Sequence, residues 1–438
     1  MAEQGRKSLE NKIVVRVGKK LALSTLGSGE TIAELSRLST SDLIETVLGS
    51  ALEASASDVH FEPEENETRI RFRIDGLLYD ATRIPREAYQ KASSRLKLAG
   101  SMKLNREGEA GDGNFAIRYE ASSTSRTVDV RISVNPSEFG ETIVLRLLDP
   151  RELRRSFGEL GLRADDEKIA DRVLKQPNGM VLVTGPTGSG KTTTLYAILL
   201  KLHTPEKKII TIEDPIEYDI AGIEQTEVNP DKGYTFESGL PSLLRQDPDV
   251  ILVGEIRDIE TAEIALDASL TGHLVLSTLH TNDALGAIPR LIGLGARREA
   301  IASALDLVVG ERLVRTLCPN CREARSPTET ERAGIESLMR RLPSRVPRES
   351  YAADLLYTPR GCALCNGMGY KGRIGVFELL AVRGELNDYI EKEASLDLLR
   401  EKARELGFVS LQEDGVLKAL KGVTTLDEVE RATGPIVW

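Results

Sequence analysis

A glycine-rich loop near the middle of the chain most constrains what the chain can fold into. The apolar run Val181–Thr184 precedes the pattern G-x-x-x-x-G-K-T at Gly185–Thr192, and Thr193 then opens a segment expected to be helical. Glycines let the backbone curl so that its N–H groups point at phosphate oxygens, and the helix N-terminus adds a positive dipole. The order strand, loop, helix therefore predicts a phosphate-binding P-loop. A glycine turn in an α/β core is the alternative.

The residues of this loop have separate expected roles. Lys191 is expected to reach the β- and γ-phosphates of a nucleotide, and the Thr192 hydroxyl is expected to hold Mg²⁺. The predicted nucleotide-binding residues are Gly185, Pro186, Thr187, Gly188, Ser189, Gly190, Lys191, Thr192 and Thr193. A phosphate loop alone does not identify the process that nucleotide hydrolysis drives. That process has to be inferred from the rest of the chain.

Length and composition bound the class of protein. The chain has 438 residues, of which 40% are hydrophobic and 29% charged, and its formal net charge is -10. These values are ordinary for a protein of two or three globular domains. No apolar run approaches the roughly 20 residues of a membrane span and no signal peptide opens the chain, so we expect a cytoplasmic protein. The acidity disfavours non-specific nucleic-acid binding as the main role.

The four cysteines of the chain form two C-x-x-C pairs. They are Cys318, Cys321, Cys362 and Cys365. Thiols stay reduced in the cytosol, and two such pairs with no spare cysteine are typical of a tetrahedral Cys₄ zinc site. Four sulfur ligands leave no open position on the metal, so the predicted role of the zinc is structural. Two unrelated pairs of buried thiols are the alternative.

Residues 41–149 are predicted to form a small α/β domain. A helical segment begins the domain, with Ser41 as its expected N-cap. Strands with period-two alternation are predicted at 68–75, 127–134 and 142–148. An N-terminal arm or remnant at 1–40 is expected before this domain, and a linker at 150–160 after it.

The P-loop domain is predicted over 161–438. Predicted strands alternate with helical segments, an order typical of a largely parallel sheet. The strands are predicted at 181–184, 209–213, 250–254 and 274–278. A zinc-binding insertion is expected at 318–370 and a helical tail at 384–438. The polar, proline-punctuated stretch 322–350 inside the insertion is expected to be mobile.

Two acidic segments follow expected core strands. Glu213-Asp-Pro-Ile-Glu217 ends one strand, where a carboxylate can face a nucleotide and act on the attacking water; simple strand termination is the alternative. Gly254-Glu255 ends the next strand in the layout of a Walker B motif. Because Gly254 stands where many such motifs carry the Mg²⁺-linked Asp, Glu255 is expected to serve the metal through water.

Two histidines flank a further expected strand. His273 precedes this strand and His280 follows it. A neutral histidine can change its hydrogen-bond partner when a phosphate leaves, without a large charge cost. Both are therefore predicted to sense the γ-phosphate, with ordinary core histidines as the alternative.

Together these motifs resemble the secretion ATPase superfamily of type II secretion and type IV pilus assembly. Four family signatures occur in order: the P-loop at 185–192, the acidic box at 212–217, the atypical Walker B motif at 249–255 and the histidine box at 271–282. The small domain matches through Ser57–Pro63 and Arg71–Gly76. The Cys₄ insertion followed by Gly372–Glu378 is similar to the assembly and secretion branch, since retraction motors of the superfamily lack those cysteines. The resemblance covers 41–433.

The resemblance implies a fold and further site residues. It implies a small PAS-like α/β domain and a RecA-like P-loop ATPase domain with the Cys₄ insertion and a helical C-terminal region. Glu217 would be the catalytic glutamate and Glu255 the Walker B acid. Arg131 and Arg146 of the small domain would swing onto the phosphates when the two domains close, where a guanidinium stabilises developing charge. Pairing of both arginines with surface acids is the alternative.

The resemblance also implies partners and cofactors. It implies a cytoplasmic homo-hexamer that uses ATP, Mg²⁺ and Zn²⁺ and acts on an inner-membrane platform protein, so that pilin or pseudopilin subunits are pushed outward. No direct nucleic-acid partner is expected. One alternative is a nucleic-acid-translocating ATPase on the same core. The negative net charge of the chain and the absence of an aromatic-basic stripe argue against it. The other alternative is a scaffold that binds ATP without hydrolysing it. The presence of the expected site residues argues against it: Lys191, Thr192, Glu217 and Glu255.

The sequence departs from the family pattern in three places. Members of this branch usually carry a further N-terminal domain, whereas only about 40 residues precede the small domain here, so the chain is either naturally short or truncated. Family members often show Pro-Gln-Asp-Gly where this chain has Ala110–Gly113, and usually Gln at Glu311. The first change is expected to alter a loop near the nucleotide, and the second to add a charge at a ring position.

Overall fold

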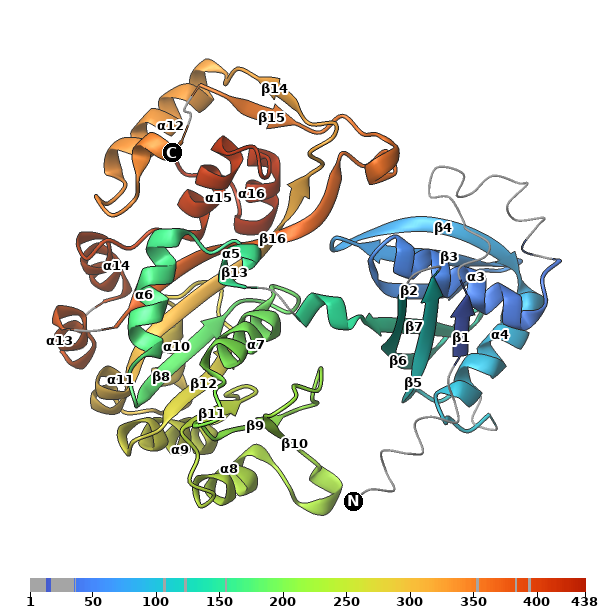
Figure 1. The fold of residues 1–438 in the computed structure, drawn as a ribbon, viewed down its shortest axis with the longest axis horizontal. Coiled ribbons are helices and arrows are strands. Elements are labelled where there is room, and N and C mark those ends of the chain that lie inside the picture. The colour runs from blue at the N-terminus through green and yellow to red at the C-terminus, as the bar shows by residue number, and fades with distance from the viewer. Residues whose placement is uncertain are drawn as a thin grey trace. The chain divides into compact units, whose positions relative to one another are not determined.

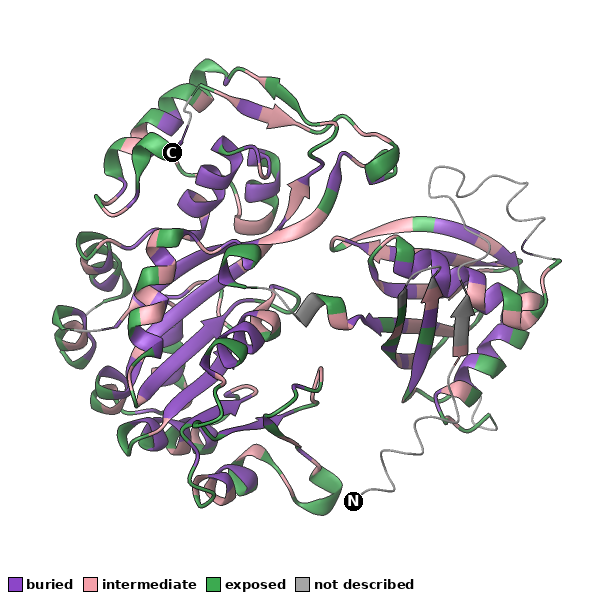
Figure 2. Cartoon of the chain, viewed as in Figure 1, coloured by how far each residue is buried: buried purple, intermediate pink, exposed green. Residues whose placement is uncertain are grey.

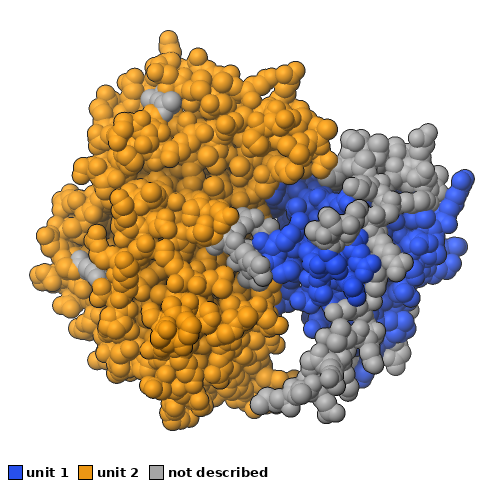
Figure 3. Space-filling model, in the orientation of Figure 1, with its two compact units in different colours: residues 1–152 blue, residues 153–438 orange. Residues whose placement is uncertain are grey.

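The chain divides into two compact units, Met1–Glu152 and Leu153–Trp438 (Figure 3). The structure is a computed structural model that describes residues 13–16, 35, 37–104, 108–121, 124–153, 156–351, 354–382, 384–392 and 395–438. The boundary between the units falls inside the predicted linker. Most of the N-terminal arm predicted at 1–40 lies outside the described residues.

The described part of unit 1 is a mostly antiparallel sheet with two helices. Its elements are β1 (Ile13–Arg16), α3 (Thr40–Glu53), β2 (Ala56–Pro63), β3 (Glu67–Ile74), β4 (Leu77–Pro85), α4 (Arg86–Ala99), β5 (Gly111–Ala121), β6 (Thr124–Ser137) and β7 (Gly140–Leu148) (Figure 1). The strand order is β1-β5-β6-β7-β2-β3-β4, with β1 parallel to β5. The three strands predicted by alternation correspond to β3, β6 and β7.

One side of this sheet builds the core of unit 1. Along β3 half-buried and buried residues alternate strictly, as a strand with one covered face requires. The helix α3 begins earlier than predicted, because Ser39 rather than Ser41 is its N-cap. The Ser39 hydroxyl accepts a hydrogen bond from the Asp42 N–H at 3.2 Å, which satisfies one of the free donors of the first turn.

Unit 2 contains a seven-stranded, largely parallel sheet. Its strands are β8 (Gly179–Thr184), β9 (Ile209–Glu213), β10 (Glu224–Glu227), β11 (Val250–Val253), β12 (Leu274–Leu279), β13 (Leu305–Leu317) and β16 (Tyr370–Ala381). The order is β10-β9-β11-β12-β8-β13-β16, and only β16 runs antiparallel to its neighbour. The predicted parallel sheet is thus present, and the fold class is confirmed as α/β.

Helices cover both faces of this sheet. The helices are α5 (Phe157–Leu160), α6 (Ala164–Leu174), α7 (Lys191–Leu202), α8 (Phe236–Leu244), α9 (Ile259–Leu270), α10 (Ala287–Leu294), α11 (Arg298–Ala304), α13 (Glu385–Glu391) and α14 (Leu396–Glu405). Met180 and Leu182 of β8 pack in the core with α8 to α11, whereas Val181 and Val183 pack with α5 to α7. Alternate side chains of one strand therefore anchor two cores, and β8 and β12 are buried throughout (Figure 2).

The segment between the cysteine pairs, part of which the sequence predicted to be mobile, contains regular secondary structure. It contains β14 (Glu323–Arg325), the helix α12 (Glu329–Arg341) and β15 (Leu356–Thr358). Ile335 and Leu338 of α12 are buried against Val416 and Leu417 of α15 (Leu411–Leu420). Polar residues dominate α12, but these apolar residues lie three apart and so share one face of the helix. The tail ends in α16 (Leu426–Thr433), which confirms its helical character.

Candidate functional site

The phosphate loop has the geometry that its glycines suggested. The buried strand β8 ends at Thr184 and α7 begins at Lys191, so the loop connects the strand directly to a helix N-terminus. Gly188 and Gly190 have φ values of +79° and +108°, which side chains with a Cβ rarely adopt. A Cβ on Gly190 would lie 2.2 Å from Oε1 of Glu311, so a side chain there would have to displace Glu311. The loop is thus shaped for backbone N–H contacts with an anion.

Lys191 lies folded back onto the loop. Its Nζ donates hydrogen bonds to the backbone carbonyls of Gly185 at 2.8 Å and Pro186 at 3.0 Å. Burial lowers the pKa of Lys191 below its usual value. The negative charges of Glu311 and Glu255 raise this pKa but do not outweigh the effect of burial. Thr192 is exposed at the start of α7, where its hydroxyl is accessible. These two side chains are therefore available to a phosphate group and its Mg²⁺.

Glu255 and His280 meet at the same edge of the sheet as the loop. Each follows the carboxyl end of its strand, and β11, β12 and β8 are parallel neighbours. His280 Nε2 lies 3.3 Å from Glu255 Oε2. Arg257, which the sequence analysis did not select, forms an ion pair with the other oxygen of Glu255 and lies 3.6 Å from Asp214. The only sequence signal for Arg257 was its place two residues after the predicted Walker B acid.

His273 lies at the opposite edge of the sheet. It immediately precedes β12, and its Nδ1 lies 3.0 Å from the carbonyl oxygen of Ala268. Its own carbonyl accepts a hydrogen bond from the N–H of Gly179, the first residue of β8. The full length of a strand, roughly 20 Å for six residues, separates His273 from the phosphate loop of the same chain. Parallel strands place the residues before and after a strand at opposite edges, so His273 does not lie beside the phosphate loop of this chain. Its role as a phosphate sensor stays a prediction.

The first acid of the acidic box is already engaged within the protein. Glu213 is 4% exposed and accepts hydrogen bonds from the hydroxyls of Thr211 and Tyr196 and from the amide of Gln225. A carboxylate held by three donors has little capacity left to act on water. The half-buried Glu217, four residues on, stays the candidate for that role.

The two candidate arginines lie side by side in unit 1. Arg131 of β6 and Arg146 of β7 are cross-strand partners, and both are accessible at least in part. Nε of Arg146 donates to the buried carboxylate of Asp58 at 3.1 Å, and Arg73 lies 3.5 Å from the other oxygen of Asp58. Asp58 was not selected from the sequence as a site residue, although it belongs to the segment that carried the resemblance. It anchors Arg146 while leaving 57% of that side chain exposed.

Glu311 does not lie where the sequence analysis expected it. It was expected to add a charge at a contact between subunits, but only 1% of it is exposed, and it is buried inside unit 2 on β13. Its Oε2 accepts a hydrogen bond from the Thr194 hydroxyl at 2.8 Å, 117 residues away in sequence. No local pattern relates these two residues, so only the folded sheet brings them together.

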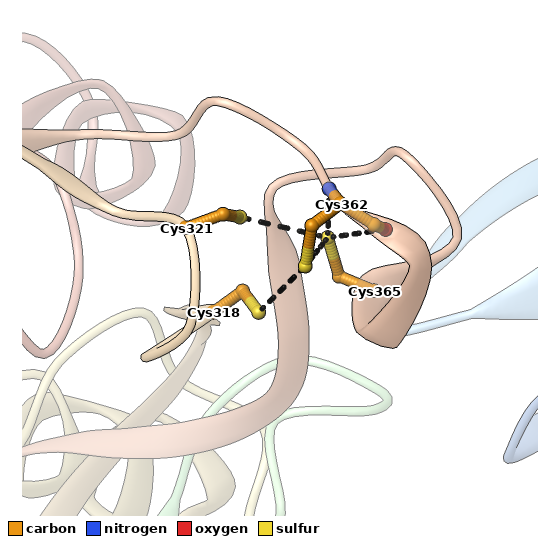
Figure 4. Close-up of side chains that lie close together, drawn as sticks. All are labelled: Cys318, Cys321, Cys362 and Cys365. Atoms are coloured by element: carbon orange, nitrogen blue, oxygen red, sulfur yellow. Dashed lines mark hydrogen bonds between the residues drawn. The ribbon is translucent and has the colours of Figure 1, made fainter.

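The four cysteines converge into one cluster (Figure 4). Their sulfur atoms all lie within 4.8 Å of one another, and three pairs are 3.8 to 3.9 Å apart. Four thiolates at about 2.3 Å from a tetrahedral zinc ion lie roughly 3.8 Å from each other, so the residues fit this metal. Backbone N–H groups of Gly361, Cys362 and Gly369 donate to the sulfurs, as outer contacts of a metal site do.

Comparisons with known proteins identify the family. The model of the family described as "Type II/IV secretion system protein" matches residues 33–431. The "Type II secretion system ATPase E" of Vibrio cholerae is 44% identical over 391 residues, which are 89% of this chain and 75% of that protein. The "Type IV pilus assembly ATPase PilB" of Myxococcus xanthus is 41% identical over 393 residues, or 90% of this chain and 68% of that protein.

Solved structures show the same fold. A structure of the pilus retraction motor PilT with bound ADP covers 88% of this chain and 95% of that chain, with a TM-score of 0.57 and 25% identity. The Legionella pneumophila ATPase DotB covers 90% of this chain and 96% of that chain, with a TM-score of 0.66 and 20% identity. Among the described residues, no helix combines the length and apolar character needed to cross a bilayer. From its sequence, its fold and the arrangement around its phosphate loop, the chain belongs to the type II/IV secretion system protein family, as an ATPase related to those of type II secretion and type IV pilus assembly.

Proposed function

We propose that the chain hydrolyses ATP at its phosphate loop and uses the energy as a motor for pilin or pseudopilin assembly. The observation that carries the proposal is the convergence of the loop, Glu255 and His280 at one edge of the parallel sheet. Phosphoryl transfer depends mainly on positioning and on charge stabilisation, and this edge would supply backbone donors, the cation of Lys191, the acid Glu255 and the imidazole of His280. The proposal covers both secretion and pilus extension, since relatives of both kinds match over similar lengths.

Each loop residue has a role in this proposal. The backbone of Gly185 to Thr193 would cradle the phosphates, and Lys191 would leave its carbonyl partners to reach the β- and γ-phosphates. Thr192 would hold Mg²⁺ directly and Glu255 through water. Together these two residues would hold the Mg²⁺, which would supply positive charge against the negative charge of the phosphates.

The remaining residues would act on the reacting groups. Glu217 would orient or deprotonate the attacking water, and His280 would exchange its contact with Glu255 for the γ-phosphate. Arg131 and Arg146 would stabilise charge on the phosphates when the two domains close. What supports this last role is their pairing across neighbouring strands, with Asp58 holding Arg146 in place.

We propose that the Cys₄ cluster holds a structural zinc ion and that the active form is a cytoplasmic hexameric ring. The sulfur distances support the first of these statements. The ring would act on a platform protein at the inner-membrane face, and no nucleic acid would take part. The net charge of -10 supports the absence of a nucleic-acid partner.

Steady-state ATPase activity measured against protein concentration tests the proposal, with light scattering to give the mass in solution. We expect turnover that rises with formation of a six-subunit species and that is lost in Lys191→Ala. A well-folded protein that binds ATP without turnover at any concentration would contradict the proposed motor and favour a scaffold. Stimulation of turnover by added DNA would favour a nucleic-acid motor instead.

A further inference from the structure

A buried carboxyl lies directly beneath the phosphate loop and has no part in the proposed chemistry. Glu311 is on β13, the neighbour of β8, and its backbone carbonyl oxygen would be 2.6 Å from a Cβ on Gly185. Its side chain reaches the other end of the loop, where Oε1 would be 2.2 Å from a Cβ on Gly190. Oε2 accepts the hydrogen bond from Thr194 in the first turn of α7. One residue therefore supports both ends of the loop.

The Glu311 carboxyl lies in a buried environment near the sheet and the loop. Among the described residues, none forms an ion pair with Glu311, and Lys191 donates to loop carbonyls instead. Arg312, next on the same strand, donates to the backbone oxygens of Glu311 and Asn282. Glu378 of β16 pairs with Gly310, so it lies on the other face of the sheet, where it accepts the Ala284 N–H.

The protonation state of Glu311 follows from this environment. Burial raises its pKa to about 8, although the Thr194 hydrogen bond and the charge of Lys191 lower it. At neutral pH the group is therefore mainly a neutral acid. An ionised Glu311 would place a negative charge beside the phosphates of a bound nucleotide and would compete with them for Lys191. Bound phosphate thus favours the protonated form still further.

We propose that Glu311 is a positioning residue of the phosphate loop whose carboxyl must be protonated when nucleotide phosphates bind, so that nucleotide affinity depends on pH. The proposal rests on the proposed function, because it needs nucleotide at this loop. The neutral carboxyl supports the loop through Thr194 and Gly190 without repelling the phosphates. Loss of the proton leaves the packing in place but sets a like charge under the ligand. By linkage, affinity falls as the pH rises through the pKa of the free protein.

The dissociation constant of Mg²⁺-ADP, measured by calorimetry on the full chain between pH 7.5 and 9.5, tests this proposal. ADP is used because its affinity can be measured without turnover. Glu311→Gln keeps the shape of the side chain and removes its charge. We expect the ratio of the wild-type Kd to the Glu311→Gln Kd to be close to one at pH 7.5 and to rise about tenfold by pH 9.5, which corresponds to a pKa shift of about one unit on binding. Deprotonation of Lys191 weakens binding in both proteins, which is why the ratio is compared.

A second measurement follows the protons taken up on binding. Calorimetry at pH 8.5 in two buffers of different ionisation enthalpy should show that the wild type takes up on the order of half a proton more per bound ADP than Glu311→Gln does. Glu378→Gln is the matched control for a buried carboxyl on the other face, and its uptake should equal that of the wild type. A constant Kd ratio together with equal proton uptake by the wild type and Glu311→Gln would overturn the role of Glu311. Absence of ADP binding to the wild type and to Glu311→Gln at every pH would instead overturn the proposed function itself.

Discussion

At the residue scale, the acids near the loop differ in how far they are already engaged. Glu213 is held by three donors inside the protein, and Glu255 is held between Arg257 and His280. Arg257 orients the Glu255 carboxylate toward His280 and would have to share it with a metal. Glu217 is the last acid of the box, and its assignment as the catalytic glutamate stays a prediction.

We predict that Glu217→Gln retains nucleotide binding but loses turnover by a factor of at least about 100. A neutral amide keeps the size of the side chain but cannot accept a proton from the attacking water, and general bases typically contribute factors of about 100 to 10,000. Steady-state ATPase assays and an ADP dissociation constant measured on the same preparation check the two parts. The exposed Glu224→Gln of β10 is the control and should behave as the wild type. Unchanged turnover in Glu217→Gln would remove Glu217 from the catalytic assignment.

At the scale of elements, buried ion pairs tie the C-terminal helices to the sheet. Glu428 of α16 accepts hydrogen bonds from the side chain of Arg315 on β13 at 2.6 Å and from that of Arg431 at 2.7 Å. Burial alone raises the pKa of Glu428, but the hydrogen bonds from Arg431 and Arg315 outweigh it and hold the pKa at about 2. The usual pKa of a glutamate in an unfolded chain is about 4.3. Glu428 therefore stabilises the folded state above that value, and the stabilisation is lost as the pH falls toward 2.

We predict that Glu428→Gln lowers the free energy of unfolding at pH 7 by about 2 kcal/mol, because hydrogen bonds to a buried charge are lost. The difference from the wild type should shrink as the pH falls from about 4.5 toward 2, where the native glutamate also takes up a proton. Denaturant unfolding at pH 7 and pH 3 measures it. Asp427→Asn removes an exposed charge from the same turn and should cost well under 1 kcal/mol. An equal deficit for Glu428→Gln at both pH values would contradict the assigned cause.

At the scale of the whole molecule, the cysteine cluster connects the two ends of the long segment between β13 and β16. Cys318 follows β13 and Cys365 precedes β16, so the two pairs bring the ends of the intervening segment together beside neighbouring strands. The helix α12 inside this segment packs on α15 of the tail. The phosphate loop lies in a different core, built from α5 to α7 on the sheet. Zinc should therefore stabilise the insertion and the tail far more than the loop.

We predict one zinc ion per chain in the wild type and none in Cys362→Ser. The loss of a thiolate opens the tetrahedral site, so α12 and α15 should exchange their amide hydrogens faster. The dissociation constant of ADP should change by less than about threefold, since changes at distant sites act independently. Metal analysis, hydrogen exchange and calorimetry measure the three quantities. Ser326→Ala, an exposed change within the insertion, should retain the zinc. A zinc-free wild type with protected helices would contradict the structural role of the metal.

Local patterns in the sequence were enough to predict the phosphate loop, the cysteine cluster and part of each sheet, namely β3, β6 and β7 of unit 1 and β8, β9, β11 and β12 of unit 2. Glycine conformation, period-two alternation and paired C-x-x-C spacing are short-range properties, so they can be recognised without the fold. Only the tertiary structure decided what lies across the sheet. The direction of the strands places His273 at the edge of the sheet opposite the loop. Strand pairing places Glu311 under the loop. Packing on α15 buries one face of the helix formed by the polar stretch 329–341. These outcomes depend on contacts between residues distant in sequence, whose energies no local pattern contains.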